Sequence, residues 1–238
     1  MILALETSTQ WGSAALIDQG KVLAEVSSDR QKSHSELINP MIEACLTRAA
    51  VQFSDLTLVA TGFGPGSFTG IRVAGNVAKS LSYTLNIPLF ALDSLFLLAA
   101  QSKVKAQADK LPVLSMINAY KNMVYYGLYD LSSDIPSVLI PASVVPVRDL
   151  DQTIKQDQFL VVGDGYQTYK NFFSELFLKK LRRNENAQDY PLASTLGLLS
   201  EMLSQTQPTL DWKSFLPLYI RASEAEENRK GILFTPLK

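Results

Sequence analysis

GPGSFTGIRVA, residues 64–74, is the stretch that decides how this sequence is interpreted. It follows a short apolar run at residues 58–62 and leads into Ile71–Leu85, which has helical character. A strand, a glycine-rich turn and a helix start form a candidate anion site, because the first N–H groups of a helix lack intrahelical partners and the helix dipole favours negative charge. The residues that we assign to phosphate or nucleotide contact are Gly64, Gly66, Ser67, Thr69 and Gly70.

The same turn has a second interpretation. Ser67 and Thr69 can cap the helix instead of donating to a phosphate. No Gly-Lys-Ser/Thr sequence closes the loop, so it is not a Walker A motif. Glycine-rich turns before helices also serve packing alone, and the residues leave both interpretations open.

Strand and helix patterns alternate on both sides of this turn. We expect strands at Ile2–Leu5, Ser13–Asp18, Val22–Ser27 and Leu58–Thr61, an edge strand at Ile87–Ala91, and later strands at Pro112–Ile117, Met123–Tyr129 and Phe159–Val162. We expect helices at Ser33–Ala50, Ile71–Leu85, Ser94–Gln101, Tyr166–Leu181 and Ala193–Leu203. Pro40 should bend the first helix or mark a late start. The pattern alone predicts an α/β fold, and the gap from Gln101 to Leu111 is the best boundary if the chain forms two lobes, 1–103 and 104–238.

Composition limits the function classes. The chain has 238 residues and a formal net charge of −1, so no global field attracts nucleic acid or an anionic membrane. Cys45 is the single cysteine and falls on the apolar stripe of a helix, which indicates a core residue and excludes an internal disulfide. The N-terminus lacks signal-peptide features and no apolar stretch could span a bilayer, so we expect a cytoplasmic protein without a membrane partner.

Two sites could carry chemistry. Glu6-Thr7-Ser8-Thr9 follows the first strand, where a carboxylate could orient a metal or act as a base; the alternative is a turn that satisfies its own backbone. His34 is the single histidine, so a His-x-x-x-His metal pair cannot exist and a Ser-His-Asp hydrolase would need His34 itself. We expect no catalytic residue and no metal site, with His34 capping or flanking the first helix.

Two surfaces could bind partners. Gly70, Ala74 and Ala78 lie on one helical face, where small residues admit either a partner helix or the first helix of the same lobe. Lys179–Arg183, KKLRR, is the clearest basic run; it suits a solvated helix end or contact with tRNA.

The GPGSFTGIR string resembles the signature of the TsaB (YeaZ) family, which serves threonylcarbamoyladenosine formation in tRNA. Further strings resemble family landmarks in the same order: MILALETST at 1–9, SHSELINP at 33–40, VGDG at 162–165, LPLYIR at 216–221 and SEAE at 223–226. The resemblance implies an actin-like (ASKHA) fold of two ribonuclease-H-like lobes.

The resemblance also implies a function. A TsaB-like chain is a non-catalytic subunit that scaffolds the transferase TsaD together with TsaE, touches tRNA only through the complex, and forms a homodimer when TsaD is absent. It implies no cofactor on the isolated chain, with ATP or ADP shared at a complex interface. The partner interface would comprise His34, Leu37, Met41, Gly70, Ala74 and Ala78. The alternative is a stand-alone actin-like phosphotransferase or hydrolase dependent on a nucleotide.

Two departures from the family pattern bear on activity. The catalytic paralogue TsaD carries an acidic residue four positions after its equivalent of Glu6, where this chain has Gln10. Residues 118–123, NAYKNM, stand where the family has Asp-Ala-Arg followed by Gly-Glu. Any function of that acid and arginine is therefore doubtful in this chain.

Overall fold

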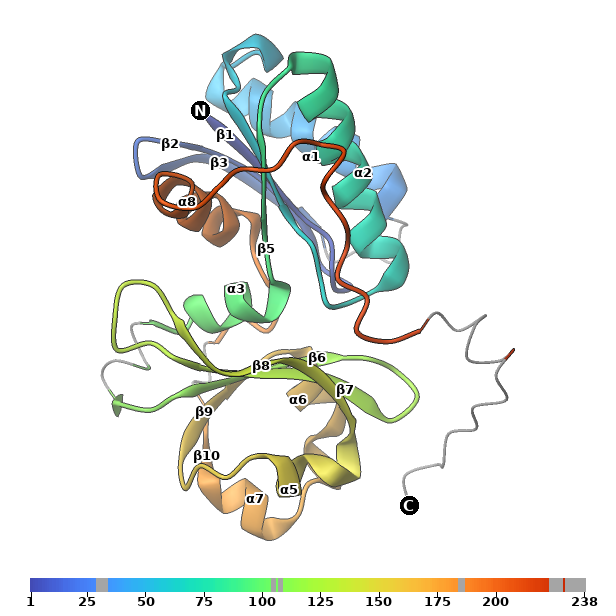
Figure 1. Cartoon of the computed structure of the whole chain (residues 1–238), viewed down its shortest axis with the longest axis vertical. Coiled ribbons are helices and arrows are strands. Elements are labelled where there is room, and N and C mark those ends of the chain that lie inside the picture. The colour runs from blue at the N-terminus through green and yellow to red at the C-terminus, as the bar shows by residue number, and fades with distance from the viewer. Residues whose placement is uncertain (29–33, 104–105, 107–108, 184–186, 223–228, 230–238) are drawn as a thin grey trace. The chain divides into compact units, whose positions relative to one another are not determined.

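The computed structural model describes residues 1–28, 34–103, 106, 109–183, 187–222 and 229 (Figure 1). The chain divides into two compact units. Unit 1 comprises Met1–Leu97 and Pro191–Leu218, and unit 2 comprises Leu98–Tyr190 and Tyr219–Lys238. This division differs from the expected lobes 1–103 and 104–238, because Pro191–Leu218 returns to unit 1.

Unit 1 is built on a five-stranded sheet with the strand order β3-β2-β1-β4-β5. The strands are β1 (Ile2–Glu6), β2 (Gly12–Asp18), β3 (Lys21–Ser28), β4 (Leu58–Gly62) and β5 (Leu89–Leu92). β1 pairs antiparallel with β2 and parallel with β4. The apolar runs of β1 and β4 are fully buried, as central strands covered on both faces require. The predicted edge strand is confirmed as β5.

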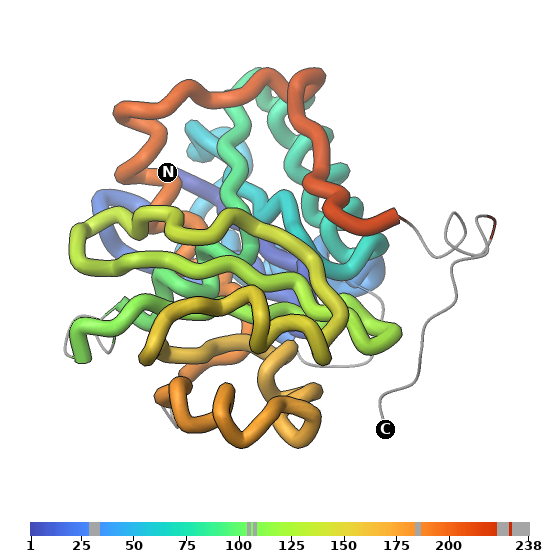
Figure 2. The backbone as a smooth tube through the Cα atoms, turned by 60° about the horizontal axis from the view of Figure 1, so that its bottom comes forward, coloured from blue at the N-terminus to red at the C-terminus, as the bar shows by residue number. Residues whose placement is uncertain are grey.

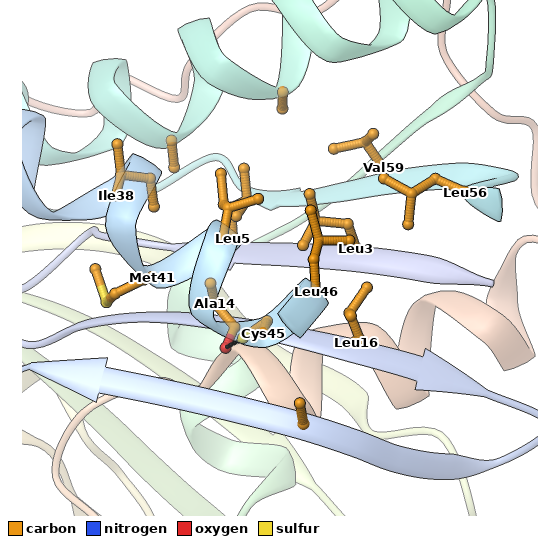
Figure 3. Close-up of a cluster of buried hydrophobic side chains, with 14 of the residues drawn as sticks. Leu3, Leu5, Ala14, Leu16, Ile38, Met41, Cys45, Leu46, Leu56 and Val59 are labelled. Carbon is orange, nitrogen blue, oxygen red and sulfur yellow. Dashed lines mark hydrogen bonds between the residues drawn. The ribbon is translucent and has the colours of Figure 1, made fainter. Parts of the chain in front are cut away.

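Helices cover both faces of this sheet. On one face lie α1 (His34–Ala49) and α2 (Phe68–Leu85), and on the other lies α8 (Ala193–Leu203) (Figure 1). Side chains alternate along β1, so Leu3 and Leu5 join the cluster under α1 while Ala4 faces Gly197 of α8 (Figure 3). α1 has begun at His34, before Pro40, which rules out the late start; Ser33 lies outside the described residues.

Unit 2 repeats the same strand order. Its sheet runs β10-β9-β6-β7-β8, with parallel pairing of β6 to β9 and antiparallel pairing of β6 to β7. The strands are β6 (Val113–Asn118), β7 (Met123–Asp130), β8 (Ser137–Pro146), β9 (Phe159–Val162) and β10 (Leu181–Arg182). The short helices are α3 (Ser94–Ala100), which spans the unit boundary, α5 (Leu150–Thr153), α6 (Asp164–Tyr169) and α7 (Glu175–Lys180). α6 and α7 lie on one face of the sheet (Figure 1, Figure 2). The 3-10 turns of the chain are η1 (Phe53–Asp55), η2 (Val147–Asp149) and η3 (Lys170–Phe172).

For unit 2 one strand was missed and one prediction was wrong. The missed strand is β8. The single helix expected over Tyr166–Leu181 is instead α6, η3, α7 and the start of β10. The break occurs because Phe173 is extended, with φ −79° and ψ 147°, and the Ser174 hydroxyl then caps a new helix by accepting the Phe177 N–H at 3.1 Å. None of the helices within the described residues combines the length and hydropathy of a membrane span.

Candidate functional site

Glu6 ends β1 and is fully buried. The Ser8 N–H donates to Glu6 Oε1 at 2.6 Å, and the Ser94 hydroxyl donates to Oε2 at 3.2 Å. Burial raises the pKa of Glu6, and the hydrogen bonds only partly oppose this. The carboxyl group therefore joins the turn after β1 to the start of α3.

Asp93 stands beside this cluster. Its Oδ1 accepts the N–H groups of Leu95 and Phe96 at 2.7 and 3.0 Å, which caps α3. Burial raises the pKa of Asp93 to about 6. Our sequence analysis missed Asp93 and Ser94; the signal that could have found them is an Asp-Ser pair directly before the apolar run Leu95–Ala100.

The glycine-rich turn lies directly against the end of β1. A Cβ atom at Gly66 would be 2.1 Å from the Ser8 carbonyl oxygen, and one at Gly70 would be 1.9 Å from that of Thr7. The Ser67 N–H donates to Ser8 O at 2.7 Å, and Leu218 N donates to Phe63 O at 2.8 Å. Glycine is needed at positions 66 and 70 because two backbone segments touch there.

Two N–H groups at the start of α2 are engaged inside the protein. Ser67 Oγ accepts from Gly70 N at 3.2 Å, and Ser67 O accepts from Ile71 N at 2.9 Å. Ser67 is therefore the helix cap, as one of the two interpretations expected. The Ser8 hydroxyl is buried beside this turn, next to the Glu6 carboxyl group, and Thr69 is exposed. Contact of Gly64, Gly66, Ser67, Thr69 or Gly70 with a nucleotide stays a prediction.

The small face of α2 points into unit 1. The Thr7 hydroxyl donates to Gly70 O at 2.7 Å and accepts from Ala74 N at 3.3 Å. Ala74 and Ala78 are 0% exposed. Internal packing is thus the correct interpretation of this face, because the small residues let α2 approach the end of β1.

The other expected interface residues lie on α1. Met41 is buried in the core between α1 and the sheet (Figure 3). Leu37 and His34 are partly exposed. The His34 Nε2 atom lies 2.7 Å from the Thr9 carbonyl oxygen, so this ring fixes the start of α1 to the β1–β2 turn. Of the six residues expected at the interface, four are therefore buried: Met41, Gly70, Ala74 and Ala78.

Unit 2 has a corresponding site at the end of β6. A Cβ atom at Gly163, whose φ is +110°, would lie 1.9 Å from the Met116 carbonyl oxygen. The next residue, Asp164, accepts the Asn118 N–H at 3.0 Å. Burial raises the pKa of Asp164 to about 6, and the nearby charge of Asp189 adds to the increase. The Tyr169 hydroxyl donates to Asn118 Oδ1 at 3.0 Å.

The departure at residues 118–123 forms the turn between β6 and β7. Tyr120, Lys121 and Asn122 have positive φ values of 58°, 49° and 60°. Arg221, from the LPLYIR string, donates to the carbonyl oxygens of Ala119 and Tyr120. The string at 223–226 lies outside the described residues. Among the described residues, no group of three or more His, Cys, Asp or Glu side chains could hold a metal ion.

Comparison with known proteins decides the family. A family model described as TsaD, tRNA N6-adenosine threonylcarbamoyltransferase, matches residues 21–229. The tRNA threonylcarbamoyladenosine biosynthesis protein TsaB of Buchnera aphidicola subsp. Schizaphis graminum is 33% identical over 79% of this chain and 90% of its own length. The chain belongs to the TsaB family. TsaB of Bacillus subtilis is 29% identical over 94% of this chain and 96% of its own length.

Solved structures agree with this assignment. YeaZ from Pseudomonas aeruginosa is 26% identical, covers 92% of this chain and 98% of its own, and superposes with a TM-score of 0.77. Together with the strand order repeated in each unit, this confirms the predicted α/β fold class of two ribonuclease-H-like lobes, the actin-like (ASKHA) class. As a TsaB family member, the chain is a tRNA threonylcarbamoyladenosine biosynthesis protein.

Proposed function

We propose that this chain is a non-catalytic subunit that holds the transferase TsaD in a working arrangement, with TsaE docking on the pair in the cytoplasm. The observation that carries the proposal is the engagement of the reactive groups of unit 1. Glu6 accepts hydrogen bonds from Ser8 and Ser94, and the His34 ring is within hydrogen-bond distance of the Thr9 carbonyl oxygen. These groups hold loops together, which is a structural role.

Replacing Glu6 with Gln tests this assignment. Glutamine keeps an acceptor for the Ser8 N–H and a polar group toward Ser94, but it cannot exchange a proton. We expect a reconstituted complex with Glu6→Gln to form threonylcarbamoyladenosine at a rate within about twofold of the unsubstituted complex. A loss of a hundredfold or more, with normal folding and normal binding to TsaD, would show that Glu6 is catalytic and would refute the proposal.

The partner surface is the outward face of α1 and α2 rather than the small face. Val73, Val77 and Leu81 recur every four residues on α2, so they share one helix face, and Leu37 of α1 is similarly placed against the same core. All four are partly exposed. We call these four residues the α1–α2 surface. Apolar side chains left partly exposed favour self-association, and a two-fold homodimer through this surface would compete with TsaD.

Val77→Asp tests this surface, with Asn76→Asp as the matched control because Asn76 is exposed on the neighbouring face. We expect Val77→Asp to shift the free protein from dimer to monomer in light scattering and to abolish capture of TsaD, while the control does neither. Circular dichroism checks the fold, and Leu81→Gln provides a milder second variant. A folded Val77→Asp that still pairs with itself and with TsaD would exclude the α1–α2 surface.

A nucleotide site is the second candidate function. The start of α2 beside the glycine-rich turn at residues 64–70 supports contact with ATP or ADP shared with a partner. We expect the isolated chain to bind ATP weakly, to show no turnover and to carry no stoichiometric metal. Calorimetry, a phosphate-release assay and elemental analysis check these three statements. Robust ATP hydrolysis by the clean protein would favour the stand-alone actin-like enzyme.

A further inference from the structure

The side chains of residues 170–183 in unit 2 divide into a buried group and an exposed group. Phe173 and Phe177 point into the core beside Phe159; the ring centroids of Phe173 and Phe177 are 5.1 Å apart, and those of Phe159 and Phe177 are 5.4 Å apart. This aromatic anchor fixes the rotation of α7. Since residues three and four apart share a helix face, Leu176, Lys179 and Lys180 are grouped on one face of α7.

The outward face is unusually apolar for a surface. Leu176 is 73% exposed and Phe172 is 46% exposed, although both are large apolar side chains. Leu178 is 37% exposed on the same short helix, but it lies two residues from Leu176 and therefore on another side of the helix. Exposed large apolar side chains such as Leu176 and Phe172 are candidates for contact with another molecule.

The same face is cationic. The Arg183 side chain does not contribute to this cationic face, because its guanidinium group forms a salt bridge with Asp189 at 2.6 Å. Both side chains are largely buried. Lys179 and Arg182 are exposed and Lys180 is partly exposed, and Arg182 donates to the carbonyl oxygens of Lys179 and Leu181 without losing its charge. Glu175 is the single acidic residue in the sequence from 170 to 183.

We propose that the surface formed by Phe172, Leu176, Lys179, Lys180 and Arg182, the cationic patch, binds the tRNA in the assembled complex. The cations would contact backbone phosphates, and Phe172 would stack on an unpaired base, which is how basic and aromatic side chains combine on single-stranded RNA segments. This inference rests on the proposed function, because it assigns to this chain a direct contact with the substrate of the complex.

The length of α7 favours RNA over an anionic membrane as the partner. α7 has only six residues, which gives too small an apolar face for stable binding in a membrane surface. The net charge of the chain is −1, so the patch is a local feature that adds to binding sites elsewhere in a complex and does not hold RNA alone. A patch of this kind positions a bound RNA and makes its affinity depend on salt.

The test compares three variants within the reconstituted complex with TsaD and TsaE, using unmodified tRNA transcript as the probe. Lys179→Glu/Lys180→Glu changes the patch. Lys110→Glu/Lys155→Glu changes two other exposed lysines of unit 2 by the same total charge. Phe172→Ala removes the aromatic ring. Binding is measured at several salt concentrations, and capture of TsaD is measured in parallel.

We expect the patch double variant to weaken tRNA binding by on the order of tenfold and to reduce the slope of log Kd against log salt by about 2. Phe172→Ala should weaken binding about tenfold with an unchanged slope. The control pair should match the unsubstituted complex. Equal binding by the patch and control variants overturns this inference while leaving the subunit role intact.

Other outcomes name a different occupant and also overturn it. Loss of TsaD or TsaE capture by the patch variant would make the patch a protein interface. Co-sedimentation of the chain with phosphatidylserine vesicles, lost in the patch variant while tRNA binding is kept, would make it a membrane contact. Failure of the unsubstituted complex to bind or modify tRNA would instead refute the proposed function.

Discussion

Unit 1 and unit 2 share one strand order, yet the segments that join their fourth and fifth strands differ. In unit 1 this connection contains α2, a continuous helix of 18 residues. In unit 2 it is divided into α6, η3 and α7, none longer than 6 residues. In both units a glycine after the fourth strand touches the backbone at the end of the first, at Gly66 and at Gly163. The close approach is therefore common to both units, and the helix that follows it is not.

The helices α2 and α7 bury different kinds of side chain. α2 needs a face of glycine and alanine to reach the Thr7 hydroxyl, and its larger residues are left for the outside. α7 is anchored by two phenylalanines and presents Leu176 to solvent. Unit 1 thus carries the proposed partner surface, and unit 2 carries the proposed cationic patch.

The largest expected difference in stability is between introducing arginine at a buried small residue and introducing it at an exposed large one. Ala78→Arg places an unpaired charge at a position that is 0% exposed, which should cost more than about 4 kcal/mol and prevent unit 1 from folding. Leu176→Arg, at 73% exposure, should change stability by less than about 0.5 kcal/mol. Urea unfolding followed by circular dichroism measures both. A stable, folded Ala78→Arg would mean that the small face of α2 can open outward.

The next effect tests whether the two glycine contacts are equivalent. Gly66→Ala and Gly163→Ala each press a Cβ atom against a backbone carbonyl, and we expect each to lose about 3 kcal/mol or more of unfolding free energy. Gly163→Ala should lose more, because its φ of +110° is also strained for alanine. Gly20→Ala is the control: φ is +72° but nothing lies within 4 Å, so the loss should be about 1 kcal/mol. If Gly66→Ala lost no more unfolding free energy than Gly20→Ala, the contacts at Gly66 and Gly163 would not be equivalent.

Much of this architecture could be predicted from local pattern, and the exceptions have physical causes. β1, β4 and the Gln19-Gly20 turn carry strong signals because their apolar runs are buried and their turn chemistry is specific. β8 carries little signal because it is an edge strand whose residues are exposed or half-buried and which contains Pro141 and Pro146. Its position is set by pairing with β7 rather than by its own residues.

The site was harder to predict because its contacts join distant residues. Small residues on α2 fit a partner helix as well as an internal strand end, so the pattern cannot choose; the choice is made by Thr7, 63 positions away. The roles of Glu6 and His34 likewise depend on Ser94 and Thr9, which approach them only in the folded unit. The cap at Ser67, in contrast, needs only the neighbouring residues and was among the predicted alternatives.

A smaller effect compares Asp93 of unit 1 with Asp164 of unit 2. The pKa of each rises from an ordinary 3.8 to about 6, so the folded state binds the proton more tightly than the unfolded state. Their contribution to stability is therefore full below about pH 4 and is lost as the pH rises to about 6. Each Asp→Asn variant keeps the acceptor Oδ1, so it should gain up to about 3 kcal/mol over the unsubstituted chain at pH 7.5 and nothing at pH 3.5. Urea unfolding at both pH values checks this. The raised pKa of Glu6 adds a pH dependence of the same sign that is common to every variant. An Asp→Asn variant that is less stable than the unsubstituted chain at pH 7.5 would contradict the prediction that the ionised Asp93 or Asp164 side chain destabilises the fold.

The smallest effect concerns the turns that follow the first strand of each unit. In unit 1 the turn comprises residues 7–11, which form hydrogen bonds with one another and with Glu6. In unit 2 the turn contains Tyr120, Lys121 and Asn122, whose φ values are in the left-handed region. A side chain with a Cβ atom costs about 1 kcal/mol there, and tyrosine gains little in return because Tyr120 is 53% exposed. Tyr120→Gly should therefore be more stable than Tyr120→Ala by about 0.5–1 kcal/mol, after allowance for the greater freedom of glycine in the unfolded chain. Both variants keep the backbone N–H of residue 120, which donates to Asn118 Oδ1, and its carbonyl oxygen, which accepts from Arg221. Their difference in urea unfolding thus isolates the backbone strain. If alanine were equal to or better than glycine, the backbone at position 120 would carry no strain for glycine to relieve.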